Sequence, residues 1–210
     1  MKIFKVPRFF RLFFPNKTWG FSTSEKVIFL TFDDGPDPRI TPWLLDFLVN
    51  NNIVATFFCV GENVKKYPEI YARILAEGHA VGNHCMRHQK GTNVTLEEYV
   101  QSVELASQFI DSNLFRPPYG RMTIRQTHAI RKKYAIIMWS WLSFDYDPSI
   151  SVHKIIKKAK RQIQAGDILV LHDNSKTTDR LKVILPEIIE ISRAKGLGFS
   201  KIQKDIKVDR

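Results

Sequence analysis

The chain has 210 residues, which is the size of one domain with a substantial buried core. Hydrophobic residues make up 44% of it and charged residues 25%, proportions that exclude collagen, extended disorder and a protein with many membrane spans. The net charge of +11 is compatible with an anionic partner such as nucleic acid, anionic lipid or anionic glycan. The sequence contains no zinc finger, basic leucine zipper or RNP-like strand, so we expect no nucleic-acid partner.

Residues 1–25 form a basic, aromatic N-terminal segment ahead of a domain that we expect over residues 26–210. Cations alternate there with phenylalanines, as Arg8 and Arg11 do with Phe9 and Phe10. Such a segment suits either peripheral contact with an anionic membrane or packing against the domain's own core. It lacks the apolar stretch and cleavage site of a signal peptide, and no later run is long enough to span a bilayer. These features favour a cytoplasmic or peripheral-membrane location.

From residue 27 onward, short apolar runs typical of strands alternate with amphipathic runs typical of helices. Strands are predicted at residues 27–32, 55–60, 80–83, 135–139, 167–171 and 198–202. Helices are predicted at residues 40–50, 68–77, 95–109, 123–133, 151–164 and 179–194. This alternation indicates one α/β domain with a parallel sheet and crossover helices, either open or closed into a barrel. Functional residues of such folds collect beyond the carboxyl ends of the strands.

Carboxylates and histidines follow two of these predicted strands. Asp33 and Asp34 follow the first, where neighbouring side chains diverge, so that one can bind a metal while the other accepts a proton. His84 and His88 follow the third, and their spacing places them on one face if the segment is helical. An ordinary turn and two unrelated surface histidines are the alternatives. Together, Asp34, His84 and His88 would form a metal site with open coordination positions, as catalysis requires.

Three later segments add candidates. Arg116 and Tyr119 lie in the loop RPPYG, whose prolines can hold an arginine and a backbone N–H at fixed positions. Trp139 and Trp141 are candidates for stacking on a sugar ring, although tryptophans in such runs more often belong to the core. His172 leaves a buried strand at its carboxyl end and suits a general acid, with a hydrogen-bonded core histidine as the alternative.

The ordered motifs TFDDGP, HxxxH, RPPYG, an aromatic and acidic segment, and LHD resemble those of the polysaccharide deacetylases, the NodB-homology domain of carbohydrate esterase family four. The resemblance extends from about Val27 to the C-terminus and implies that residues 26–210 are the catalytic domain. It implies a distorted (β/α) barrel with fewer than eight complete strands. It also implies a metal-dependent hydrolase that removes N-acetyl groups from N-acetylglucosamine-containing glycans of the peptidoglycan or chitooligosaccharide type and releases acetate.

The resemblance also assigns residue roles. Asp34, His84 and His88 are the implied metal ligands, Asp33 is the implied catalytic base, and Arg116 is the residue that holds the base carboxylate. Zinc is the expected metal for this mixed nitrogen and oxygen set, with cobalt, nickel and manganese as alternatives.

The remaining implied roles concern the oxyanion and the leaving group. Tyr119 contributes a backbone N–H at the oxyanion and contacts the substrate, and His172 is the general acid. Asp145 is the carboxylate that orients His172, with Asp147 as a substitute because the aromatic and acidic motif departs from the family pattern. Cys85 stands where the family usually has serine or threonine, and as a spacer it need not affect catalysis.

Other functions remain open at this point. The same site would serve an O-acetyl xylan esterase or a deformylase acting on a lipid-linked sugar, and the basic aromatic segment gives weight to the lipid-linked substrate. A non-catalytic glycan-binding relative would have lost Asp33, a metal ligand or His172, and this sequence retains all of them.

Overall fold

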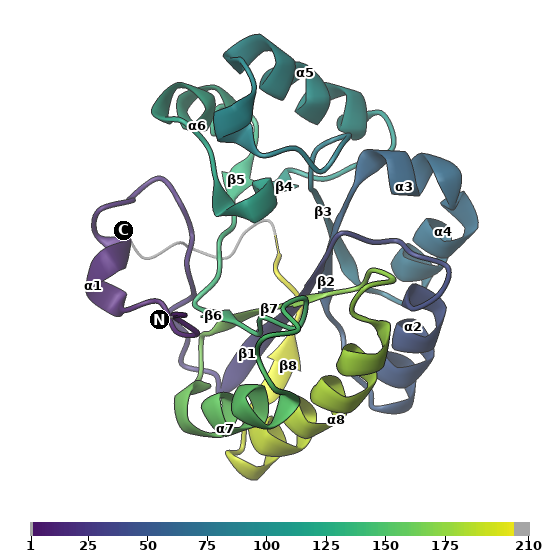
Figure 1. The fold of residues 1–210 in the computed structure, drawn as a ribbon, viewed down its shortest axis with the longest axis vertical. Helices are drawn as coiled ribbons and strands as arrows, with labels where there is room; N and C mark the ends of the chain where they lie inside the picture. The colour runs from purple at the N-terminus through teal and green to yellow at the C-terminus, as the bar shows by residue number, and fades with distance from the viewer. Residues whose placement is uncertain (1, 204–210) are drawn as a thin grey trace.

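The computed structural model describes residues 2–203, so residue 1 and residues 204–210, the outer ends of the two predicted regions, lie outside the described residues. One curved parallel sheet forms the centre of the molecule, with helices around its outside (Figure 1). Its strands are β1 (Val27–Asp33), β2 (Thr56–Cys59), β3 (Ala80–Asn83), β4 (Leu114–Phe115), β5 (Ala135–Ile136), β6 (Trp141–Leu142), β7 (Ile168–His172) and β8 (Gly198–Ser200).

The sheet is a barrel that does not close. Its order is β5-β4-β3-β2-β1-β7-β6, and β8 pairs with residues 27–29 of β1, ahead of the residues of that strand that pair with β2. Within the described residues, β5 and β6 stand at the two ends of this order and do not pair with each other. The predicted parallel α/β fold with fewer than eight complete barrel strands is therefore confirmed.

The helices that surround the sheet follow the apolar periodicity of the sequence. Thr95 and Glu98 form a capping box at the start of their helix, each side chain accepting from the other residue's backbone N–H, at 3.2 and 2.8 Å. The helices are α1 (Arg8–Arg11), α2 (Thr41–Asn50), α3 (Gly61–Lys66), α4 (Pro68–Ala76), α5 (Leu96–Ser107), α6 (Ile124–Ile130), α7 (Val152–Gln162) and α8 (Thr178–Ala194). Among the described residues, none of these helices is both long and apolar enough to cross a bilayer.

The gap between β5 and β6 is occupied by the N-terminal segment. The backbone N–H of Thr18 donates to the carbonyl of Ile136 at 2.8 Å, and that of Val6 donates to the carbonyl of Ser140 at 2.8 Å. Phe4, Trp19 and Phe21 are buried against the barrel. Of the two alternatives for this segment, packing on the domain's own core therefore holds for part of its length.

One predicted strand was wrong in its extent. Residues 135–139 were expected to form one strand, but β5 ends at Ile136 and β6 begins only at Trp141. The residues between them bond the N-terminal segment, as Met138 does by donating its backbone N–H to the carbonyl of Thr18 at 2.7 Å. A continuous apolar run indicates burial, but it cannot show that the sheet is open at that point.

Candidate active site

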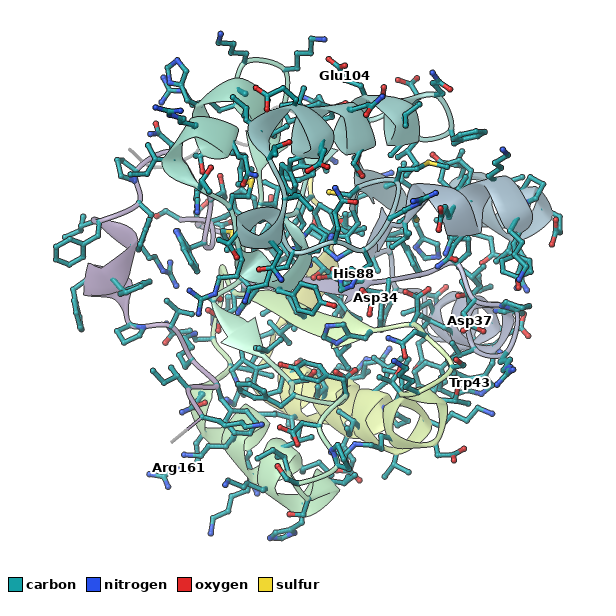
Figure 2. All side chains as sticks on the ribbon, turned by 45° about the horizontal axis from the view of Figure 1, so that its top comes forward. Asp34, Asp37, Trp43, His88, Glu104 and Arg161 are labelled. Atoms are coloured by element: carbon teal, nitrogen blue, oxygen red, sulfur yellow. The ribbon has the colours of Figure 1, made fainter. Side chains whose placement is uncertain are left out.

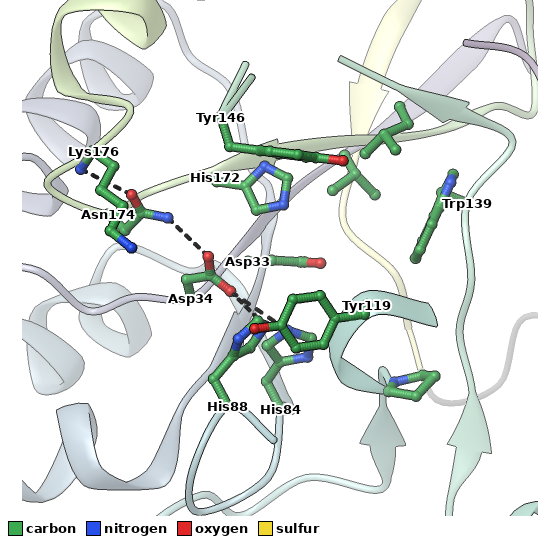
Figure 3. A pocket seen from close by; sticks show the side chains of 13 residues that line it. Asp33, Asp34, His84, His88, Tyr119, Trp139, Tyr146, His172, Asn174 and Lys176 are labelled. Atoms are coloured by element: carbon green, nitrogen blue, oxygen red, sulfur yellow. Dashed lines mark hydrogen bonds and ion pairs between the residues drawn. The ribbon is translucent and has the colours of Figure 1, made fainter. Parts of the chain in front are cut away.

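A cavity of about 400 Å³ opens beyond the carboxyl ends of the strands, where Figure 3 shows carboxylates, imidazoles and aromatic rings pointing toward one another. Figure 2 shows two of these residues, Asp34 and His88, together near the middle of the molecule, far from Glu104 and Arg161 at opposite edges. The lining residues are Asp33, Asp34, His84, His88, Pro117, Tyr119, Trp139, Leu142, Tyr146, Val170, His172, Asn174 and Lys176.

Asp34, His84 and His88 converge on one point of this cavity. One candidate ligand atom from each lies within 4.8 Å of the others. The Asp34 Oδ1 atom is 3.1 Å from Nε2 of His88 and 3.6 Å from Nε2 of His84. That oxygen is buried, and among the described residues it has no hydrogen-bond partner. An unpaired buried carboxylate oxygen that faces two imidazole nitrogens is the arrangement that a divalent cation would satisfy.

The protonation of the two imidazoles also fits a metal. His84 places Nδ1 2.7 Å from the carbonyl oxygen of Arg116, and because a carbonyl can only accept, in the neutral ring Nδ1 carries the proton and Nε2 has the free lone pair. Burial lowers the pKa of His88 to about 4, so this ring is neutral at neutral pH. Neutral imidazoles and a carboxylate are the forms that bind metal. The three residues therefore fit a divalent ion.

The two histidines reach this position from a loop rather than from a helix. Residues 84–90 contain no helical turn, and Cys85, at a φ of 66°, reverses the chain between the two histidines. Positive φ values recur at Asp34 (83°), Tyr119 (59°) and Phe144 (56°), each within a motif loop of the site. Non-glycine residues adopt this region at a cost, and such strain concentrates at functional sites.

Asp33 is held by a buried arginine. Nη1 of Arg116 donates to Asp33 Oδ1 at 2.6 Å and to Thr31 Oγ1 at 2.7 Å. The guanidinium is completely buried, and it also donates to the carbonyls of Ile137 and Met138. Every one of these partners is fixed in or beside a strand. The Asp33 carboxylate is consequently fixed in the cavity beside the three metal-site residues.

On the other side of the cavity, His172 is paired with Asp145. Oδ1 of Asp145 accepts from His172 Nδ1 at 2.7 Å, and Oδ2 accepts from the His172 backbone N–H at 2.8 Å. Ser143 donates its hydroxyl to the same carboxylate at 2.8 Å. Burial alone would lower the pKa of His172, but the Asp145 carboxylate raises it to about 9. The ring therefore carries a proton at neutral pH.

The structure shows which of Asp145 and Asp147 lies beside His172, and which of Trp139 and Trp141 lines the cavity. Asp147 pairs with Lys2 and bonds Ser149, so Asp145 is the acid beside His172. Trp139 lines the cavity. Trp141 is fully buried and packs near Phe4, so the expectation that it contacts a sugar was wrong. Tyr119 lines the cavity as expected, with its ring 4.6 Å from that of His88.

Several lining residues were not singled out from the sequence. Asn174 donates its side-chain amide to Asp34 Oδ2 at 2.8 Å, and its only signal was its position just after LHD. The Tyr146 ring lies edge-on to His172 with the ring centroids 5.0 Å apart, and Leu142 and Val170, on β6 and β7, line the same cavity. Residues of this kind on strands are indistinguishable in sequence from core residues, because their apolar pattern is the same.

The comparison with known proteins agrees with this geometry. A family model described as polysaccharide deacetylase matches residues 21–136. A peptidoglycan-N-acetylglucosamine deacetylase of Bacillus cereus is 35% identical over 182 residues, which cover 81% of this chain and 85% of that protein. This chain belongs to the polysaccharide deacetylase family. It is therefore an enzyme of a hydrolytic family, and its cavity is the candidate active site.

Two further relatives extend the comparison. A chitooligosaccharide deacetylase of a Bradyrhizobium strain is 34% identical, with 80% of each chain covered. The crystal structure of the Bc1960 peptidoglycan N-acetylglucosamine deacetylase superimposes with a TM-score of 0.80 at 27% identity, covering 98% of this chain and 100% of that one. Deacetylases of the family thus share this chain's fold over nearly its whole length.

Proposed function

We propose that this polysaccharide deacetylase is a metal-dependent hydrolase that removes N-acetyl groups from N-acetylglucosamine-containing glycans and releases acetate. The observation that carries the proposal is the convergence of three elements on one cavity: the metal-site residues, the Asp33–Arg116 pair and the His172–Asp145 pair. The names of the relatives point to peptidoglycan or chitooligosaccharides as the glycan.

The chemistry must overcome the stability of an amide. A divalent metal held by Asp34, His84 and His88 would act as a Lewis acid, which polarises a carbonyl and lowers the pKa of water. Zinc is the first choice for this ligand set, with cobalt, nickel and manganese as alternatives.

Asp33 acts as the base in this proposal. Its carboxylate lies beside the metal-site residues and takes a proton from water as the water attacks the acetamide carbonyl carbon. Arg116 holds that carboxylate in place through the 2.6 Å bond. The oxygen of the carbonyl gains negative charge during the attack, and the backbone N–H of Tyr119 donates to it.

His172 acts as the acid. An amine leaves only once its nitrogen is protonated, so this step needs a proton donor that is charged at neutral pH. The pKa of about 9 meets that requirement, and Asp145 fixes the ring through Nδ1 so that Nε2 is the proton-bearing atom available to the substrate. Cleavage of the C–N bond then leaves acetate and a free amino sugar.

The experiment that tests this proposal compares acyl groups. The purified protein would be incubated with chitooligosaccharides, peptidoglycan fragments, O-acetylated xylan and an N-formylated amino sugar, and the products identified by mass spectrometry. We expect loss of acetyl groups from N-acetylglucosamine residues. Acyl loss confined to the xylan ester or to the formylated sugar would refute the proposed substrate and leave one of the alternative activities.

A further inference from the structure

We propose that the tip of the N-terminal segment, residues 7–17, is a docking surface for an anionic lipid bilayer. The stems on either side of the tip are fixed to the barrel, by Val6 bonding Ser140 and by Thr18 bonding Ile136. The tip between them, which includes α1, stands at the outer edge of the molecule, on the opposite side from α3 and α4 (Figure 1). The barrel therefore presents this tip in a fixed position.

The aromatic side chains of the tip form two layers. Phe10 and Phe14 pack on the buried ring of Trp19, with ring centroids 5.9 and 6.0 Å away, and on each other at 5.1 Å. This inner layer supports the tip. The outer layer consists of side chains that remain open to solvent: Phe9 is 65% exposed, Leu12 79% and Phe13 72%. The inner layer explains why the tip has a defined shape, while the outer layer contributes nothing to the core.

This concentration of exposed apolar groups is confined to one place. Of the thirteen large hydrophobic side chains that are exposed in residues 2–203, five lie within the tip and a sixth, Ile3, precedes it. The other seven are scattered over separate elements, as single surface hydrophobes usually are. A contiguous exposed apolar patch marks a surface that binds a partner or a membrane.

The charge of the residues around this apolar patch indicates which kind of partner it binds. Lys2 and Lys5, which precede the tip, are paired with Asp147 and Asp167. The sequence of the tip itself, residues 7–17, contains three further cations, Arg8, Arg11 and Lys17, and no acidic residue. Lys17 lies close to the patch itself, with its Nζ 5.3 Å from the centre of the Phe14 ring. Aromatic and leucine side chains with neighbouring cations suit the interface of an anionic bilayer, where apolar groups enter and cations meet the lipid phosphates. A second copy of this chain would bring the same cations and be repelled.

The test measures binding of the full-length protein to vesicles by co-sedimentation. Vesicles of neutral phosphatidylcholine alone would be compared with vesicles that also contain phosphatidylglycerol. We expect the protein to sediment with the anionic vesicles and to be released by high salt. The triple variant Phe9→Ser, Leu12→Ser, Phe13→Ser should lose at least about tenfold in vesicle affinity, because three exposed apolar side chains no longer enter the bilayer.

A matched control carries three changes of the same kind elsewhere: Leu75→Ser, Ile124→Ser and Val183→Ser. These side chains are 47%, 89% and 53% exposed and lie on three separate helices. This variant should bind vesicles like the unaltered protein. The proposal is overturned if the unaltered protein does not bind anionic vesicles, if it binds neutral vesicles equally well, or if the tip variant binds as strongly as the unaltered protein. It is also overturned if light scattering shows a dimer that only the tip variant abolishes. No substrate is needed, so the outcome is independent of the proposed deacetylation.

Discussion

Asp33 and Asp34 are neighbours in sequence, yet the fold gives them different partners. Asp33 ends β1 and is paired with Arg116, whereas Asp34, at a φ of 83°, turns toward His84 and His88. The adjacent carboxylates can therefore divide two tasks, proton transfer and metal binding. The sequence predicted that they diverge, and the positive φ of Asp34 is the physical means.

Replacement of the base gives the first prediction. Asp33→Asn keeps the size of the side chain and an oxygen that can accept from Arg116, but it cannot take a proton from water. We expect the variant to bind one equivalent of metal while turnover falls at least about a hundredfold. Metal content and acetate release measured on the same preparation check this. His84→Ala serves as the comparison and should lose the metal as well as activity; full activity in Asp33→Asn would refute the assignment of the base.

A second prediction concerns pH. His172 donates its proton only while charged, and the Asp145 carboxylate keeps the pKa of His172 raised. In Asp145→Asn that charge is gone and the pKa falls, so His172 loses its proton at a lower pH. We expect the alkaline limb of the kcat profile to move down by about one pH unit or more. An alkaline limb at the same pH in both proteins would show that His172 is not the acid.

A third prediction concerns Asn174, which bonds the Asp34 oxygen that faces away from the histidines. Loss of this bond in Asn174→Ala frees the carboxylate to rotate. Groups that orient a metal ligand in this way usually contribute about tenfold to a hundredfold in affinity. We expect a loss of that size in competition with a chelator, with activity restored by excess metal. Unchanged metal affinity would mean that the bond does not orient Asp34.

At the scale of the element, the loop after β1 depends on a buried carboxylate in the loop after β7. Asp173 accepts from the Gly35 backbone N–H at 3.1 Å and from the Thr41 hydroxyl at 2.7 Å, and its own N–H donates to the carbonyl of Asp33. Thr41 does not cap α2, because Ile40 occupies the cap position. The Thr41 hydroxyl instead ties α2 to this loop.

The close packing of Gly35 against Asp173 predicts the effect of adding one methyl group at Gly35. A Cβ on Gly35 would stand 2.0 Å from Asp173 Oδ2, so Gly35→Ala must displace the carboxylate or the loop. We expect the free energy of unfolding to fall by about 3 kcal/mol and metal affinity to fall with it. Gly198→Ala is the control, because its Cβ would meet the nearest atom at an ordinary 3.5 Å. Equal stability of the two variants in a denaturant titration would contradict this account.

The sequence was informative about elements to different degrees. Long periodic segments such as α5 and α8 were predicted close to their observed bounds, because helix periodicity and capping are local signals. The two-residue strands β4 and β5 are defined mainly by pairing with distant partners, and no local pattern delimits them. The conformation between His84 and His88 was left open for a related reason, since a four-residue spacing does not distinguish a helix from a turn at Cys85.

For the whole molecule, motif order predicted the site better than residue pattern predicted the barrel. The polar candidates fell at strand ends and converge in one cavity, because the carboxyl ends of parallel strands meet at one edge. The opening between β5 and β6 and its occupation by the residues on either side of the tip could not be predicted, since both depend on contacts between distant parts of the chain. The burial of Trp141 follows from that arrangement.

The central claim is that a metal held by Asp34, His84 and His88 is required to deacetylate a glycan. The most direct measurement is acetate release from chitooligosaccharides and peptidoglycan fragments by protein stripped of metal, before and after zinc or cobalt is added back. We predict no release from the stripped protein and recovered release at one equivalent of metal. Acetate release that is unaffected by stripping, or a protein that binds no metal at all, would contradict the account.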